Sequence, residues 1–173
     1  MTAGLSLIDF HSHYVPSGWA LPEPRGNTPQ QKQQWDAIFR RINDEAALLE
    51  GIGTGDLAGR VVNTPTALFA PDADGDTYRR INDELAELSA RHAGRIHALA
   101  SVDAYSGEAG ARELHRAVTE LGLRGVFVDS AKGDLLIDAP QARPVLRAAS
   151  ELGVVVFVHP VNPEPLATQL APY

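Results

Sequence analysis

The sequence has no cysteine, so it carries no disulfide framework, and a metal site would have to use nitrogen and oxygen ligands. It has no apolar run near the ~20 residues that cross a bilayer, and its N-terminus lacks the basic and apolar segments of a signal peptide, so we expect a cytoplasmic protein. Basic residues are in deficit, because 15 Lys and Arg face 22 Asp and Glu for a net charge of −7. This balance disfavours a nucleic-acid groove or a basic membrane-binding face, so we expect neither partner.

Short apolar runs alternate with amphipathic stretches along the 173 residues, of which 44% are hydrophobic. We expect one domain over 1–173 of the α/β class, because strand-then-helix units of about 30 residues build such folds. The expected strands are 5–10, 58–63, 95–101, 124–128 and 154–158, and the expected helices are 34–50, 76–92, 107–121 and 140–152. The strand at 154–158 is apolar on both faces, which is typical of a parallel sheet covered by helices. Asp138 is expected to cap the last helix and Gly153 to end it.

The connection after the first strand departs from this alternation. Residues 14–33 are rich in Pro, Gly and Gln, so we expect an irregular insertion there. Long loops at the end of a strand are often functional, which makes the insertion a candidate part of a site.

The segment His11-Ser12-His13 directly follows the apolar run of the first strand. Side chains two apart share one face of a strand, so both imidazoles point the same way, about 7 Å apart at the backbone. If the strand stays regular, Asp9 lies on that face one step deeper, as a metal ligand or as a group that orients one. The last strand also ends in a histidine, His159. Three histidines at strand C-termini with one open position would form a catalytic metal site, although a lone histidine at a strand end is more often a hydrogen-bonded structural residue.

The motifs around these histidines resemble the amidohydrolase superfamily, in particular the amidohydrolase-2 branch related to aminocarboxymuconate-semialdehyde decarboxylase. The resemblance covers nearly the whole chain apart from 17–57, where it is loose. It rests on segments in this order: IDFHSHYVP at 8–16, VNTP at 62–65, YRRINDEL running on to RIHALASV within 78–102, GLRGV at 122–126 and VFVHP at 156–160.

The resemblance implies one divalent metal, most often zinc, held by His11, His13 and His159. It also implies an aspartate ligand on an eighth strand and an acid/base histidine on a sixth, and both would lie beyond Tyr173. Binuclear relatives carry a carboxylated lysine on the fourth strand. Here that strand runs to Asp129, so we expect a single metal.

Two α/β architectures fit five strands, and the metal hypothesis favours one of them. In a doubly wound open sheet, the first and fifth strands commonly lie three places apart, about 14 Å, which is too far for His13 and His159 to share an ion. In a closed (β/α)8 TIM barrel these strands face each other across the mouth. We therefore expect about the first five strands of a truncated barrel, with open edges on strands one and five. Such edges require the missing barrel segment, another chain or self-association, so a homo-oligomer is also expected.

The resemblance makes a metal-dependent decarboxylase the leading functional hypothesis, a lyase that releases CO2 from a small unsaturated or aromatic carboxylic acid. A bound metal would polarise substrate oxygens and lower the pKa of water towards ~7. The alternatives are a metal-dependent hydrolase of an amide, ester or lactone, which needs nearly the same site, and a non-catalytic remnant or interaction partner. Arg25, Arg40, Tyr14 and Trp19 are the candidate substrate contacts, against a solvated surface role for the arginines and simple packing for the aromatic residues.

Overall fold

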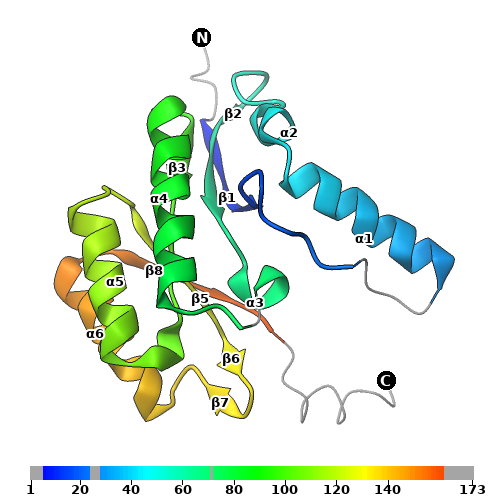
Figure 1. The fold of residues 1–173 in the computed structure, drawn as a ribbon. Helices are drawn as coiled ribbons and strands as arrows, with labels where there is room; N and C mark the ends of the chain where they lie inside the picture. The colour runs from blue at the N-terminus through cyan, green and yellow to red at the C-terminus, as the bar shows by residue number, and fades with distance from the viewer. Residues whose placement is uncertain (1–5, 24–27, 71, 162–173) are drawn as a thin grey trace.

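A parallel sheet forms the centre of the fold, and its strands follow one another in chain order (Figure 1). The structure is a computed structural model that describes residues 6–23, 28–70 and 72–161. The strands of this sheet are β1 (Leu7–His13), β2 (Leu57–Asn63), β3 (Ile96–Ala98), β4 (Ala100–Ser101), β5 (Gly125–Asp129) and β8 (Val155–His159). β3 and β4 are one strand interrupted at Leu99, whose backbone N–H donates to the Val62 carbonyl at 2.9 Å.

The order of the strands separates the two expected architectures. Hydrogen-bonded neighbours are β1-β2-β3 and β4-β5-β8, all parallel, so β1 and β8 lie at the two ends of the sheet. In a doubly wound sheet the first strand lies inside the sheet, with later strands on both sides of it. Consecutive parallel neighbours are instead the arrangement of a barrel wall.

Helices connect the strands, and a short antiparallel hairpin follows β5. The helical elements are α1 (Pro29–Ile42), α2 (Glu45–Leu49), α3 (Thr66–Phe69), α4 (Gly75–Arg91), η1 (Ala104–Ser106), α5 (Glu108–Thr119), η2 (Pro140–Ala142) and α6 (Arg143–Leu152). The hairpin consists of β6 (Ala131–Lys132) and β7 (Leu135–Leu136).

Side-chain caps explain where the first helices differ from expectation. Thr28 and Gln31 form a capping box that starts α1 at Pro29, so the irregular insertion ends before residue 33. The helix expected at 34–50 is two helices, because the Asp44 carboxylate accepts hydrogen bonds from the backbone N–H groups of Ala46 and Ala47 and starts α2.

The last helix also begins differently from expectation. Asp138 does not cap it, because the 3-10 turn η2 precedes α6 and neither element has a side-chain cap. Gly153 ends α6 as predicted, in a left-handed conformation with φ at 65° that glycine adopts without steric cost.

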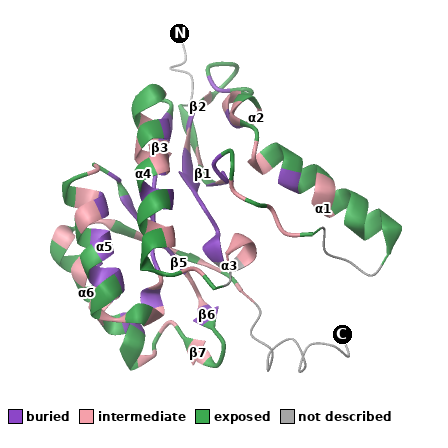
Figure 2. Cartoon of the chain, in the orientation of Figure 1, coloured by how far each residue is buried: buried purple, intermediate pink, exposed green. Residues whose placement is uncertain are grey.

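One face of the sheet is covered by α4, α5 and α6, which are buried towards the sheet and exposed outward (Figure 2). On α4 the apolar residues Ile81, Leu85 and Leu88 recur at helical spacing and are fully buried. They belong to one large cluster with Leu114 of α5 and Val126 of β5, which we call the outer core. This layer positions the strands from behind.

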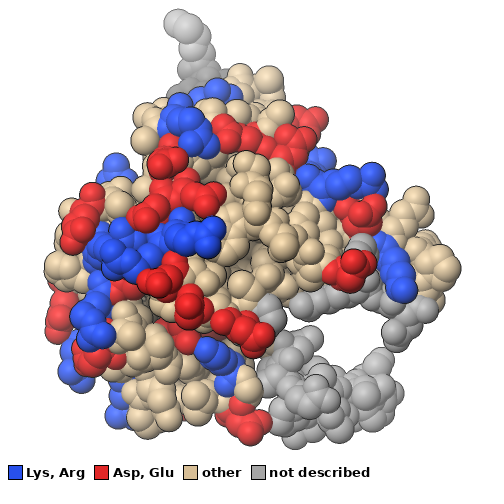
Figure 3. Space-filling model, in the orientation of Figure 1, with Lys and Arg blue, Asp and Glu red and all other residues tan. Residues whose placement is uncertain are grey.

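The outward sides of these helices carry charges of both signs. Acidic and basic side chains are interspersed over α4 and α5 (Figure 3), and ion pairs such as Arg116–Asp83 at 2.7 Å join neighbouring helices. Within the part of the chain that the structure describes, no helix combines the length and the apolar character needed to cross a membrane.

A buried asparagine ties α4 to the sheet. The Asn82 amide donates to the carbonyl of Ser101 at 3.0 Å and accepts from its N–H at 2.8 Å, so it replaces a strand partner at the end of β4. The same amide donates to Glu113 of α5 at 2.8 Å, and Arg116 neutralises that carboxylate. This network holds the C-terminal end of β4 in place, the end at which barrel sites lie.

The opposite face of the sheet, which we call the inner face, carries a much smaller core. Val61 and Val62 are adjacent on β2 and point to opposite faces, with Val62 in the outer core and Val61 on the inner face. Phe127 is buried on the inner face beside Phe157, with ring centroids 5.9 Å apart. Large apolar side chains on the end strands are 43% to 52% exposed. They are Leu7, Ile8, Phe10, Val155 and Val158.

Candidate metal centre

A β-bulge in β1 aims the first histidine at the inner face. Asp9 is opposite Arg60 and Ser12 is opposite Val62, so β1 takes three steps where β2 takes two. The extra residue lets Phe10 and His11 both turn towards β8, a role that bulges commonly have beside functional sites. The His11 ring lies 4.9 Å and the Phe10 ring 6.0 Å from the Phe157 ring, centroid to centroid.

The same bulge removes Asp9 from the face of the histidines. Asp9 is opposite Arg60 and His13 is opposite Asn63, and residues three apart on β2 point to opposite faces. The expectation that Asp9, His11 and His13 share a face is therefore wrong, because the strand is not regular. The Asp9 carboxylate instead accepts hydrogen bonds from the His11 backbone N–H at 3.1 Å and from the Ser12 hydroxyl at 2.8 Å. It supports the bulged backbone and leaves the imidazole rings to other partners.

His11, His13 and His159 meet on the inner face, although β1 and β8 are the two ends of the sheet. One ring nitrogen from each lies within 4.8 Å of the others, and the Nε2 atoms of His11 and His13 are 3.1 Å apart. Two nitrogens bound to one tetrahedral ion at 2.0–2.1 Å would be separated by about 3.3 Å. The His11–His13 pair matches this separation, and His159 lies close enough to make the three histidines a candidate metal site.

Asn63 sets the orientation of His13. The Nδ1 atom of His13 lies 2.8 Å from the Asn63 Oδ1 atom, so the ring donates Nδ1–H to the amide and keeps the Nε2 lone pair free. Burial lowers the pKa of His13 and outweighs the Asn63 hydrogen bond, which acts in the opposite direction. The neutral imidazole that results is the form that binds metals.

Asp129 occupies the equivalent position beside His159. Its Oδ1 atom lies 3.4 Å from the His159 Nδ1 atom, which leaves the Nε2 atom as the nitrogen available to the cluster. Both partners are register neighbours of their histidine, since His13 is opposite Asn63 and Asp129 is opposite His159. Neither residue is among the site residues predicted from the sequence, although each is the polar last residue of a strand, which is the signal that could have found them.

The candidate substrate contacts lie elsewhere in the described residues. Tyr14 is buried in the outer core. Trp19 donates its indole N–H to Glu84 of α4 at 2.9 Å and lies under the Arg80 guanidinium. These placements give no support to substrate contacts, and the packing alternative describes both residues.

The two arginines complete this set of candidates. Arg40 is an exposed residue of α1 that pairs with Asp36, as the surface alternative predicts. Arg25 lies outside the described residues.

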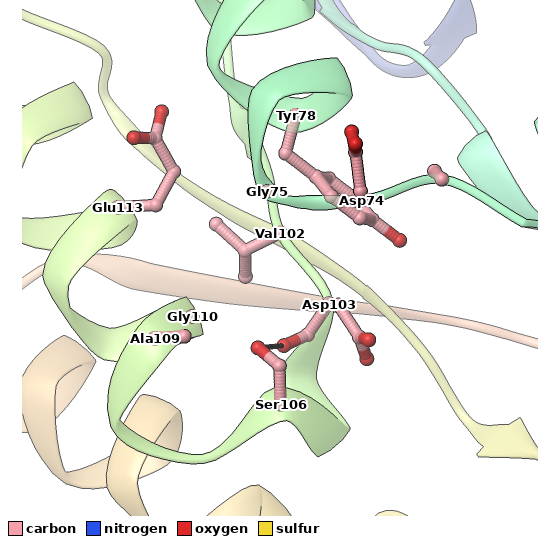
Figure 4. Close-up of a pocket in the computed structure, with 10 residues that line it drawn as sticks. Asp74, Gly75, Tyr78, Val102, Asp103, Ser106, Ala109, Gly110 and Glu113 are labelled. Carbon is pink, nitrogen blue, oxygen red and sulfur yellow. Dashed lines mark hydrogen bonds between the residues drawn. The ribbon is translucent and has the colours of Figure 1, made fainter.

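A cavity of about 220 Å³ lies between α4 and α5, away from the histidines. Figure 4 shows Tyr78 of α4 on one side of this cavity and Asp103 and Ser106, from the segment after β4, on the other. Burial raises the pKa of Tyr78 to about 12, so the phenol stays protonated. No histidine lines this cavity, and it belongs to the helix layer.

Known proteins are similar to this chain in sequence. Residues 8–172 match the model of a family described as Amidohydrolase. The chain is 27% identical to 2-amino-3-carboxymuconate-6-semialdehyde decarboxylase of Dictyostelium discoideum, over 88% of this chain and 48% of that protein. It is 34% identical to gamma-resorcylate decarboxylase of Rhodococcus jostii, over 73% of this chain and 49% of that protein. The chain thus spans about half the length of these curated relatives.

A solved structure shares the fold. The dihydroxybenzoic acid decarboxylase of Polaromonas sp. JS666, solved with bound manganese and the inhibitor 2-nitroresorcinol, superposes with a TM-score of 0.78 at 25% identity. The match covers 97% of this chain and 53% of that chain. The expected α/β fold, a TIM-type barrel represented by about its first five strands, is confirmed.

Proposed function

The chain belongs to the amidohydrolase family, and on this premise we propose that it forms the metal-binding part of a barrel that decarboxylates a small aromatic or unsaturated carboxylic acid. The observation that carries the proposal is the convergence of His11, His13 and His159 within 4.8 Å. The names of the relatives supply the reaction, since the three relatives described above are decarboxylases.

We propose one divalent ion as the cofactor of this centre. The family resemblance favours zinc, whereas the Polaromonas relative holds manganese, and three imidazoles suit either ion as a partial ligand set. A divalent ion bound there would supply a Lewis acid that polarises the oxygens of the substrate.

The inner face offers a surface that suits an aromatic acid. The rings of Phe10 and Phe157 are both partly exposed and lie 6.0 Å apart, and the ring of His11 lies 4.9 Å from that of Phe157. An aromatic substrate placed against these rings would have its carboxylate next to the histidines. We keep as a prediction that the acid/base histidine and the aspartate ligand implied by the resemblance lie beyond Tyr173.

The open edges support the proposed association with the remaining barrel segment or with a second copy. β1 and β8 end the sheet in the described residues, and both expose large apolar side chains. A sheet edge of this kind pairs readily with another strand. We keep the cytoplasm as the proposed location of the assembly.

Metal analysis tests the proposal at its base. After reconstitution with Mn²⁺ or Zn²⁺ and desalting, we expect one ion per chain. The double variant His11→Ala/His13→Ala should retain none, whereas His115→Ala, which changes an exposed histidine on α5, should bind as the parent does. A folded parent chain that binds no ion would overturn the proposal in favour of a non-catalytic remnant.

Labelled water separates the two enzymatic readings. The test substrate is gamma-resorcylate, the compound after which the Rhodococcus relative is named. A decarboxylase releases CO2 from it, and the aromatic product contains no oxygen from water. A hydrolase acting on an amide, ester or lactone would instead transfer ¹⁸O from water to its product. CO2 release that follows metal content is the expected result.

A further inference from the structure

We propose that Asp129 is a positioning residue of the metal centre: its carboxylate holds Nδ1–H of His159 so that the Nε2 atom faces His11 and His13, and its negative charge strengthens cation binding. The inference rests on the proposed metal-binding function. It assigns a role to Asp129 at the end of β5, which is not one of the three proposed ligands.

The backbone places the two groups side by side. Asp129 ends β5 and His159 ends β8, and the two residues are direct partners in the parallel register. The Ser130 N–H donates to the His159 carbonyl at 2.8 Å, so the pairing continues past the end of the strands. Neighbouring side chains in this register emerge on the same face, which brings carboxylate and imidazole together without any loop.

The two atoms of the pair that face each other lack other hydrogen-bond partners in the described residues. Oδ1 of Asp129 and Nδ1 of His159 are both buried, and among the described residues neither has a hydrogen-bond partner. They lie 3.4 Å apart, slightly beyond the usual N–H···O range of 2.7–3.2 Å. A buried carboxylate and a buried N–H are costly unless they pair, so each is the natural partner of the other.

Within the part of the chain that the structure describes, no Lys or Arg forms an ion pair with the Asp129 carboxylate. Lys132, three residues further along, pairs with Asp103 at 2.6 Å. The Tyr105 hydroxyl donates to the backbone carbonyl of Asp129 at 3.0 Å and leaves the carboxylate free. The negative charge is therefore available to the imidazole and to a cation that the imidazole binds.

Asn63 is the internal comparison for this role. It holds Nδ1–H of His13 from the same register position on β2, at 2.8 Å, but through a neutral amide. The centre thus has one histidine oriented by a neutral group and one oriented by an anion. A carboxylate on the far nitrogen raises the basicity of a histidine ligand, and such partners commonly contribute about 10- to 100-fold to metal affinity.

The test is the affinity of the full chain for Mn²⁺ alone, followed by electron paramagnetic resonance of the free ion. Asp129→Asn keeps the shape and an acceptor but removes the charge, and we expect it to weaken binding about 10- to 100-fold. The matched control is Asp134→Asn, which removes the same charge from the exposed turn of the β6–β7 hairpin and should leave affinity unchanged. His159→Ala should abolish binding.

A spectroscopic signature distinguishes positioning from general support of the fold. In the Co²⁺-loaded chain, Asp129→Asn should change the visible spectrum, while the melting temperature of the metal-free chain should not fall. Equal Mn²⁺ affinity in the parent and Asp129→Asn, with binding still lost in His159→Ala, would overturn the role of Asp129 and leave the metal centre standing. A parent chain that binds no Mn²⁺ would overturn the proposed function itself.

Discussion

The two faces of the sheet differ in how complete they are. The outer core is closed, because α4, α5 and α6 bury Leu85, Leu88 and Leu114 completely. Among the described residues, the apolar cluster of the inner face consists of the buried Val61, Leu99 and Phe127, and this face carries the three histidines. The comparison indicates that stability resides mainly in the outer core, while the proposed metal centre lies on a face that the described residues leave partly open.

Removing a side chain from the outer core should have the largest effect. Leu85 has no exposed surface, so Leu85→Ala should lower the free energy of unfolding by about 2–5 kcal/mol through lost burial and a residual cavity. Urea unfolding of the metal-free chain measures this loss. A loss below about 1 kcal/mol would show that the helix layer does not dominate stability.

Crowding the inner face should have the next largest effect. A Cβ at Gly125 would lie 2.5 Å from a Val155 methyl and 2.7 Å from the Val155 carbonyl oxygen, so β5 and β8 would have to separate. We expect Gly125→Ala to cost about 1–3 kcal/mol and to weaken Mn²⁺ binding, because His159 follows on β8. Gly75→Ala changes a glycine whose Cβ would meet open space and whose φ is not positive, and it should leave Mn²⁺ binding unchanged.

Alkaline pH should lower the free energy of unfolding through Tyr78 of α4. Its pKa is raised to about 12 in the folded chain, so the unfolded chain, with a pKa near 10, loses the proton first. Stability is therefore fully present below pH 10 and falls as the pH rises towards 12, by about 1.4 kcal/mol at pH 11. Comparing unfolding at pH 9 and pH 11 in the parent and Tyr78→Phe measures the difference. An identical pH dependence in both chains would contradict the assignment.

Polar substitutions at the open edges should have the smallest effect on stability. Ile8 and Val158 are 52% and 44% exposed, so Ile8→Ser with Val158→Ser should change the free energy of unfolding by no more than about 0.5 kcal/mol per site. Self-association, followed by sedimentation, should decrease, because apolar edge surface is removed. Leu136→Ser, an equally exposed site on the β6–β7 hairpin, is the control that should leave association unchanged. Unchanged association in the edge variant would show that these strands are not contact surfaces.

The sequence predicted those features that depend on local pattern. Apolar runs located the strands, and the endings of β1 and β8 identified His11, His13 and His159. The order of the strands followed from requiring these residues to meet. Such inferences succeed because side-chain alternation and strand endings are set by the segment itself.

The failures concern features that depend on neighbouring segments. The bulge that turns Asp9 away is visible only in the register between β1 and β2. Asn63 and Asp129 acquire their roles from lateral pairing with His13 and His159, which the order of residues along one strand does not reveal. Asp138 failed as a cap because η2 replaces the first turn of the helix.

The extra residue in β1 divides one strand into two parts with different phases. Before the extra residue, Asp9 lies opposite Arg60, and the two side chains point to the same face of the sheet. After the extra residue, His13 lies opposite Asn63 and points to the inner face, where the two side chains are hydrogen-bonded. Deleting Phe10 would remove the bulge and restore a one-to-one register, in which Asp9 stays opposite Arg60 and His13 stays opposite Asn63. The extra residue therefore serves to bring Phe10 and His11 together beside Phe157 of β8, and it does not choose the face of His13.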